Sequence, residues 1–161
     1  MRTVFLGFAF REVDRELVDF IERLLESHGL KATTGKALGG EALNEAVEAR
    51  IRNADAFIGL LTRREQFANG GWSTHGWIKD ELRYARDQSR PAIALVETDV
   101  KVEGMEQPQE NIPLDRAAPL EAFLRLSETL AEWKRKAGRT LRVRLQPDDI
   151  AELVTADAAG V

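Results

Sequence analysis

The sequence has no cysteine, and only two histidines and one tyrosine among its 161 residues. Without cysteine the chain can form neither a disulfide bond nor a thiolate metal site, so a reducing compartment is expected. Basic residues are not in excess either, because 23 Lys and Arg stand against 27 Asp and Glu, for a net charge of −4. A mildly acidic chain is a poor candidate for direct nucleic-acid binding, since neutralising phosphates needs a clustered basic surface.

Long hydrophobic runs are also missing. The first apolar run, residues 3–8, is shorter than the core of a signal peptide and carries no small-residue cleavage site. No stretch approaches the roughly 20 apolar residues of a membrane-spanning helix. No spacing of histidines and acidic residues suggests a metal site. We therefore expect a soluble, cytoplasmic protein with no membrane partner and no metal.

What the sequence does contain is a regular alternation of apolar runs and helical patterns. Its 43% hydrophobic content suits one compact domain. Apolar runs without period-two polarity predict buried strands at residues 3–8, 30–34, 54–62 and 92–96. Helical spacing of apolar residues predicts helices at residues 13–28, 41–53, 76–88 and 117–137. The alternation predicts a flavodoxin-like or Rossmann-like α/β fold, in which helices cover both faces of a parallel sheet.

The C-terminal part is less regular. Residues 97–115 carry two of the five prolines and many charges, so we expect mostly loop there. Residues 140–145 alternate Leu or Val with Arg, as a half-exposed edge strand would. We take residues 1–137 as the domain and residues 138–161 as a C-terminal extension or a linker to a further segment.

A ligand of an open parallel sheet binds outside the carboxyl ends of its strands. The segments that leave these ends are residues 8–11, 35–40, 62–77 and those from Glu97 onward. Neither the GxGxxG nor the GxxxxGK pattern of phosphate loops is present. Backbone N–H groups at Gly39 and Gly40, before a predicted helix, could hold an anion, with Lys36 and Arg11 adding charge. A plain turn with a solvated Lys36 explains the same residues equally well.

Five segments between residues 3 and 97 follow one another in an informative order. They are an apolar first strand at 4–10, a glycine-bearing loop at 35–40, an apolar strand with a polar exit at 57–62, a Trp-x-x-x-Glu motif at 77–81, and a strand opened by Arg90 and Pro91. Together they resemble the TIR (Toll/interleukin-1 receptor) family, in which the loop is the BB loop and Trp-x-x-x-Glu marks the enzymatic members. The first strand departs from the family pattern, because Gly7 and Phe8 stand where a Ser-Tyr pair is usual.

The resemblance implies an NAD glycohydrolase or cyclase that breaks the nicotinamide–ribose bond, with NAD as substrate and no further cofactor. Glu81 is then the catalytic residue. The residues expected to bind substrate are Trp77, Phe8, Ala9, Phe10, Arg11, Lys36, Gly39, Gly40 and Thr62. The resemblance further implies a bacterial antiviral-defence effector that self-associates through its BB-like loop, residues 35–41, and is triggered by an effector domain or a partner protein.

The chemistry suits Glu81 and Trp77, which lie four residues apart and so share one face of a helix. Breaking the bond places positive charge on the ribose, while nicotinamide leaves neutral and needs no general acid. One carboxylate can stabilise that charge or trap it covalently, and an aromatic ring can stack on the cationic nicotinamide. We expect the helix dipole to favour ionised Glu81, and His75, in the preceding loop, to be solvated.

Two other functions are compatible with the same residues. Many signalling TIR domains are interaction modules without catalysis, although those often lack the glutamate. Nucleoside deoxyribosyltransferases share the fold and place a Glu at a helix start with a small residue four positions later, which Glu81 and Ala85 match. Those enzymes usually carry a Gly between the two, where this chain has Arg83. Trp-x-x-x-Glu alone is common and mostly structural, so its weight comes from its place in the pattern.

Overall fold

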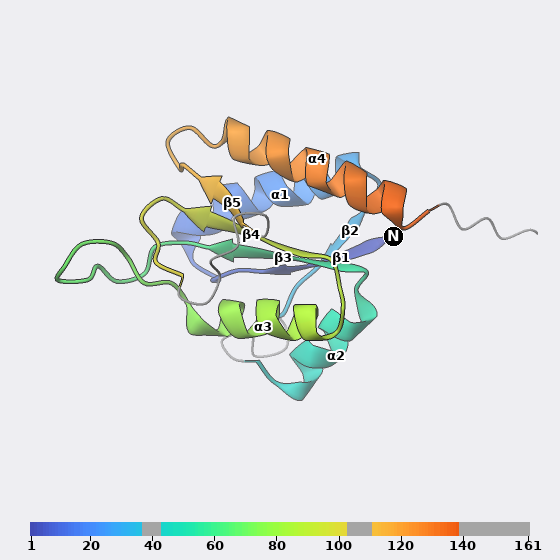
Figure 1. Cartoon of the computed structure of the whole chain (residues 1–161), viewed down its shortest axis with the longest axis horizontal. Coiled ribbons are helices and arrows are strands. Elements are labelled where there is room, and N and C mark those ends of the chain that lie inside the picture. The colour runs from blue at the N-terminus through green and yellow to red at the C-terminus, as the bar shows by residue number, and fades with distance from the viewer. Residues whose placement is uncertain (37–42, 103–110, 139–161) are drawn as a thin grey trace, which may run out of the picture.

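The computed structural model describes residues 1–36, 43–102 and 111–138. Its centre is a five-stranded sheet in the order β2-β1-β3-β4-β5, in which every neighbouring pair is parallel (Figure 1). The strands are β1 (Thr3–Gly7), β2 (Lys31–Thr33), β3 (Ala56–Leu61), β4 (Ala92–Glu97) and β5 (Asn111–Leu114). The predicted α/β fold with an open parallel sheet is confirmed.

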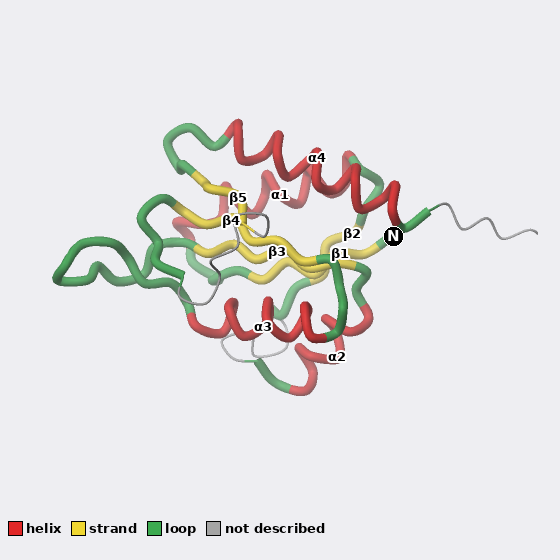
Figure 2. The backbone as a smooth tube through the Cα atoms, in the orientation of Figure 1, coloured by secondary structure: helices red, strands yellow, loops and turns green. Residues whose placement is uncertain are grey.

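Helices cover both faces of this sheet, as the sequence predicts. Figure 2 shows α1 (Arg15–Ser27) and α4 (Leu120–Lys136) on one face, and α2 (Glu45–Asn53) and α3 (Gly76–Asp87) on the other. A short 3-10 turn, η1 (Glu12–Asp14), leads into α1. Side chains of β1 point alternately to the two layers: Val4 and Leu6 pack with α1 and α4, whereas Phe5 packs with α2 and α3.

The strands β1 and β3 form the middle of the sheet. β3 is buried over its whole length, because helices cover both of its faces, and this is why its sequence shows no polar alternation. Phe57 of β3 stacks on Phe5 of β1 with the ring centroids 5.7 Å apart. The chain runs from β1 outward to β2 and returns to β3 on the other side of β1. The carboxyl ends of β1 and β3 therefore flank the topological switch point, where open α/β sheets bind ligands.

Strand β5 was not predicted, since residues 97–115 were expected to be mostly loop. The strand is only four residues long and contains Pro113, which is exposed. It lies at the edge of the sheet, where a missing N–H group costs no ladder hydrogen bond on the solvent side. Ile112 and Leu114 are buried under α4 and supply its attachment.

Other predicted boundaries differ from the observed ones by a few residues, and some lie outside the residues that the structure describes. Helix α2 begins after its N-cap Asn44, whose side chain accepts a hydrogen bond from the N–H of Val47 at 3.0 Å. Residues 41 and 42, where this helix was predicted to begin, lie outside the described residues, as does the predicted strand at 140–145. None of the helices in the described ranges is both long and apolar enough to cross a membrane.

Gly29 ends α1 in a conformation that suits glycine. Its φ of +69° lies in the left-handed region, and the N–H of Leu30 bonds back to the carbonyl of Leu25 at 2.9 Å. Leu25 and Leu30 are both buried, and β2 begins directly after this turn.

Gly29→Ala is expected to lower the free energy of unfolding by about 1 kcal/mol, because an L side chain is strained at this φ. Urea denaturation of both proteins measures the difference. Gly76→Ala is the matched control, since its new Cβ meets no atom within 4 Å and its φ is not positive. A Gly29→Ala variant as stable as the wild type would contradict the role given to this turn.

Candidate functional site

The carboxyl ends of β1, β3 and β4 meet at one edge of the sheet, as the topology predicts. Thr62 directly follows β3 and Glu97 ends β4, while Arg11 lies four residues beyond β1. The Arg11 Nη2 group donates to Thr62 Oγ1 at 2.9 Å and so spans the switch point between β1 and β3. Three of the four segments assigned to the ligand edge therefore lie together.

A buried ion cluster, formed by Arg11, Asp14, Thr62, Glu97 and Arg116, occupies this edge. Asp14 is completely buried and Glu97 is 5% exposed. Arg116 bridges them: its Nη2 donates to Asp14 Oδ1 at 2.8 Å and its Nε donates to Glu97 Oε1 at 2.9 Å. Burial alone would raise the pKa of Glu97, but hydrogen bonds from Arg116 and from the backbone N–H of Arg63 hold it below its usual value. Glu97 is thereby kept charged inside the protein.

Asp14 and Arg116 were not among the predicted site residues. Their hydrogen bond joins positions 102 residues apart, which no local spacing reveals. Asp14 stands at the start of a helix, where an exposed acidic residue is ordinary. Arg116 follows the unpredicted strand β5 and lies between the segment expected to be mostly loop, residues 97–115, and the predicted helix at 117–137.

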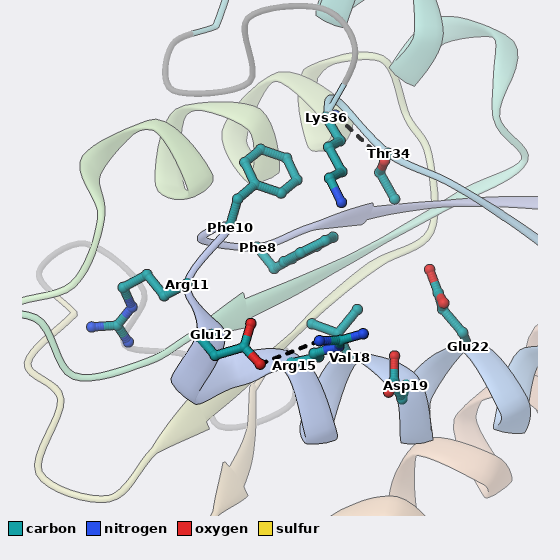
Figure 3. A pocket seen from close by; sticks show the side chains of 10 residues that line it. All are labelled: Phe8, Phe10, Arg11, Glu12, Arg15, Val18, Asp19, Glu22, Thr34 and Lys36. Carbon is teal, nitrogen blue, oxygen red and sulfur yellow. Dashed lines mark hydrogen bonds and ion pairs between the residues drawn. The ribbon is translucent and has the colours of Figure 1, made fainter.

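A pocket of about 460 Å³ opens between α1 and the chain that leaves β1 (Figure 3). Its lining consists of Phe8, Phe10, Arg11, Glu12, Arg15, Val18, Asp19, Glu22, Thr34 and Lys36. Phe8 and Phe10 contact each other edge to face with centroids 4.7 Å apart. In Figure 3, Phe8 and Lys36 extend toward α1, whereas the Phe10 ring points away from α1 and the Arg11 guanidinium turns away from Lys36. Four predicted substrate-binding residues thus share one cavity.

The other predicted binding residues lie elsewhere. Ala9 is 1% exposed and packs into the core layer of α2 and α3, so it lies on the opposite side of the chain from Phe8. Thr62 is fully buried within the ion cluster. Gly39 and Gly40 lie outside the described residues.

Glu81 lies on α3, against the carboxyl end of β1. It is 2% exposed, and a Cβ atom added to Gly7 would stand 2.5 Å from its Oε2 atom. This close approach explains why glycine occupies the position at which the TIR pattern has a hydroxyl residue. The Oε2 atom is buried and has no hydrogen-bond partner among the described residues.

The expectation that the helix dipole keeps Glu81 ionised is wrong. Burial, together with the nearby charge of Asp80, raises the pKa of the Glu81 carboxyl to about 8. The reason is that removing a carboxylate from water costs more than the dipole of a helix terminus returns. In the free protein at neutral pH, Glu81 is therefore mostly protonated.

Two aromatic rings accompany Glu81 on the same side of the sheet. Trp77 is half-buried, and its Nε1 group is buried without a hydrogen-bond partner among the described residues. The ring of His75 lies 4.5 Å from that of Trp77 and is tilted by 52°. His75 is only 8% exposed, so the expectation of a solvated side chain is wrong; packing against Trp77 buries it.

Two groups of residues therefore flank the end of β1. Gly7 and Ala9 face Glu81 and the layer of α2 and α3, whereas Phe8 and Phe10 face the pocket beside α1. Glu81 does not line this pocket. Across the described ranges, no three His, Asp or Glu side chains gather as metal ligands would.

The raised pKa of Glu81 predicts a pH-dependent stability. The folded protein binds one proton more than the unfolded chain between about pH 4.5 and 8, so the free energy of unfolding falls as pH rises through this window. The expected fall is up to about 1.4 kcal/mol per pH unit. This fall in the free energy of unfolding should be absent in the Glu81→Gln variant, which is expected to be more stable than wild type above pH 8.

Urea denaturation of both proteins from pH 5 to 9 measures this difference. Asp80→Asn is the matched control, because Asp80 is exposed and neighbours Glu81 on the same helix. It should retain most of the fall. A Glu81→Gln curve parallel to that of wild type would show that Glu81 is ionised in the folded protein.

Comparison with known proteins gives the fold a context. No family model matches the chain, and no curated protein matches it. Among solved structures, it is similar to a prokaryotic SEFIR domain, with 13% identity, a TM-score of 0.52, and coverage of 81% of this chain and 99% of that chain. A CMP N-glycosidase from Clostridium botulinum also matches, with 13% identity, a TM-score of 0.47, and coverage of 78% and 99%. The chain thus has a parallel α/β fold similar to that of a SEFIR domain.

Proposed function

We propose that the chain cleaves the N-glycosidic bond between nicotinamide and ribose in NAD, with Glu81 as the catalytic carboxylate. One observation carries the proposal: Glu81 is 2% exposed, its Oε2 atom has no partner among the described residues, and it lies beside the end of β1. A buried carboxyl without a partner is costly in a folded protein. Such groups, with strongly shifted pKa values, concentrate where chemistry is done.

The reaction needs few protein groups. The bond between ribose C1′ and the pyridinium nitrogen breaks, and its electron pair leaves with nicotinamide, which becomes neutral. The positive charge left on the ribose is stabilised by the Glu81 carboxylate. Water then adds to C1′ and loses a proton, which gives ADP-ribose; an internal nucleophile gives a cyclic product instead. No general acid is required for the leaving group.

The raised pKa of Glu81 is consistent with this role. The nicotinamide of NAD carries a positive charge, and a cation close to a carboxyl lowers its pKa. Binding of NAD thus supplies the partner that Glu81 lacks and returns it to the ionised form. Trp77 lies one helical turn away and offers a ring on which nicotinamide can stack. The ring of His75 packs against the ring of Trp77 and holds it in place.

The nucleotide half of NAD is assigned to the pocket beside α1. Lys36 and Arg11 supply positive charge for the phosphates, and Phe8 and Phe10 supply aromatic surface. Because residues 7–10 face Glu81 and the pocket alternately, an extended dinucleotide would lie across this segment. Ala9 and Thr62 act here as packing and anchoring residues of the same edge.

Glu81→Gln is expected to lower nicotinamide release from NAD by roughly 100-fold or more, because it keeps the size of the side chain and removes the charge. Concentrated protein is incubated with NAD and the products are separated by chromatography, which also distinguishes ADP-ribose from a cyclic product. For wild type, kcat/KM should rise with pH up to about 8 as Glu81 ionises.

Asp80→Asn serves as the control and should release nicotinamide at a rate close to that of wild type. Equal release by wild type and Glu81→Gln would remove Glu81 from the mechanism. Base release from deoxynucleosides, without release from NAD, would favour a nucleoside deoxyribosyltransferase-like enzyme. Turnover of neither substrate would favour an interaction module.

Activity is also expected to depend on self-association through the BB-like segment, residues 35–41, most of which lies outside the described residues. Specific activity should rise with protein concentration, in parallel with the oligomer fraction measured by light scattering. An effector domain or partner protein would raise it further, as in a bacterial defence system that depletes NAD or makes a nucleotide signal. Full specific activity in a dilute, monodisperse monomer would contradict this dependence.

A further inference from the structure

The buried ion cluster contains Arg11, which is proposed above to bind phosphate, and Asp14, which has been given no role so far. We infer that Asp14 is a positioning residue, which fixes the Arg11 guanidinium across the carboxyl ends of β1 and β3 so that Arg11 binds a phosphate group of the ligand. The inference rests on the proposed function only for the identity of the substrate. Binding of a nucleoside diphosphate alone also measures the contact between Arg11 and a phosphate group.

The geometry around Arg11 leaves its guanidinium little freedom. Asp14 Oδ2 accepts a hydrogen bond from Arg11 Nε at 3.0 Å and forms an ion pair with Arg11 Nη2 at 2.9 Å. Arg11 Nη2 donates in addition to Thr62 Oγ1, which itself donates to Asp14 Oδ2 at 3.0 Å. Three groups thus form a closed ring of hydrogen bonds at the switch point of the sheet.

Arg11 and Arg116 are used differently within the cluster. Arg116 donates from all three of its nitrogens: to Glu97 from Nε, to the carbonyl of Val13 from Nη1 at 2.8 Å, and to Asp14 from Nη2. Arg11 donates from Nε and Nη2 only, so its Nη1 group has no acceptor within the described residues. A planar guanidinium held from one side presents its remaining N–H groups in a fixed direction, which suits a phosphate.

The charges of the cluster support the same conclusion. Two buried carboxylates, Asp14 and Glu97, are paired with three guanidinium groups: Arg11, Arg116 and, at 3.9 Å from Glu97, Arg63. The Arg11 side chain nevertheless keeps 32% of its surface exposed, and it also lines the pocket beside α1. A cation that is fixed by a buried partner and still open to solvent can bind an anion without first ordering its own side chain.

Two measurements on the full chain test the inference: the Kd for ADP, determined by calorimetry, and the KM and kcat for cleavage of NAD. Asp14→Asn keeps the size of the side chain and removes its charge. We expect the Kd for ADP and the KM for NAD to rise about tenfold, while kcat changes by less than about twofold. In an Arg11→Met background, Asp14→Asn should raise neither constant further, because Asp14 acts through Arg11.

Leu130→Ala is the control for stability, since Leu130 is fully buried in the apolar layer of α1 and α4. It should destabilise the fold and leave both constants unchanged. If Asp14→Asn does not fold, Thr62→Val removes both ring bonds made by the Thr62 hydroxyl and should raise the Kd for ADP by about threefold.

Three results would overturn the inference: no binding of ADP by wild type, an unchanged Kd in the folded Asp14 or Thr62 variant, or an equal rise in the Arg11→Met background. Binding of ADP that depends on Asp14, without any release of nicotinamide from NAD, would sustain this inference while refuting the proposed function.

Discussion

The carboxyl edge of the sheet depends on the Arg116 guanidinium, which bridges the two buried carboxylates Asp14 and Glu97. Either carboxylate alone, removed from water, would be strongly unfavourable. The bridge joins the start of α1, the end of β4 and the chain that follows β5, so segments from three parts of the sequence meet there. The candidate site is built on an edge that this interaction holds together.

A second buried carboxyl near this edge, that of Glu81, has a pKa shifted in the direction opposite to that of Glu97. Glu97 receives hydrogen bonds from Arg116 and the Arg63 N–H, which lower its pKa, whereas the pKa of Glu81 is raised and its Oε2 atom has no hydrogen-bond partner within the described residues. Both groups are almost fully buried. The difference is therefore one of partners, and it is the raised pKa of Glu81 that marks this residue as the candidate for function.

The parts of the fold that follow local patterns were predicted well. The four predicted strand segments became β1 to β4. The apolar pattern is clearest in β3, because a strand covered by helices on both faces needs apolar side chains throughout, whereas β2 is a short edge strand without a buried residue. β5 was missed, since four residues with a proline at a sheet edge carry no such pattern. The pairing of Asp14 with Arg116 was also missed, because it arises only when segments distant in sequence pack together. The burial of His75 was missed because the sequence does not show that its ring packs against the ring of Trp77.

Gly7 shows how a sequence departure can acquire meaning only in three dimensions. In the sequence it is the absence of a hydroxyl from an otherwise TIR-like strand. In the structure it leaves space for the Glu81 carboxyl, because a Cβ atom there would stand 2.5 Å from Oε2 and 2.9 Å from the Phe57 ring. The SEFIR similarity, at 13% identity, establishes the fold alone. Trp-x-x-x-Glu alone is a weak pattern on any helix. Its combination with a glycine on the facing strand, at the switch point of a parallel sheet, is far more restrictive, and it is this pairing of Gly7 with Glu81 that makes α3 the helix on which the chemistry is proposed.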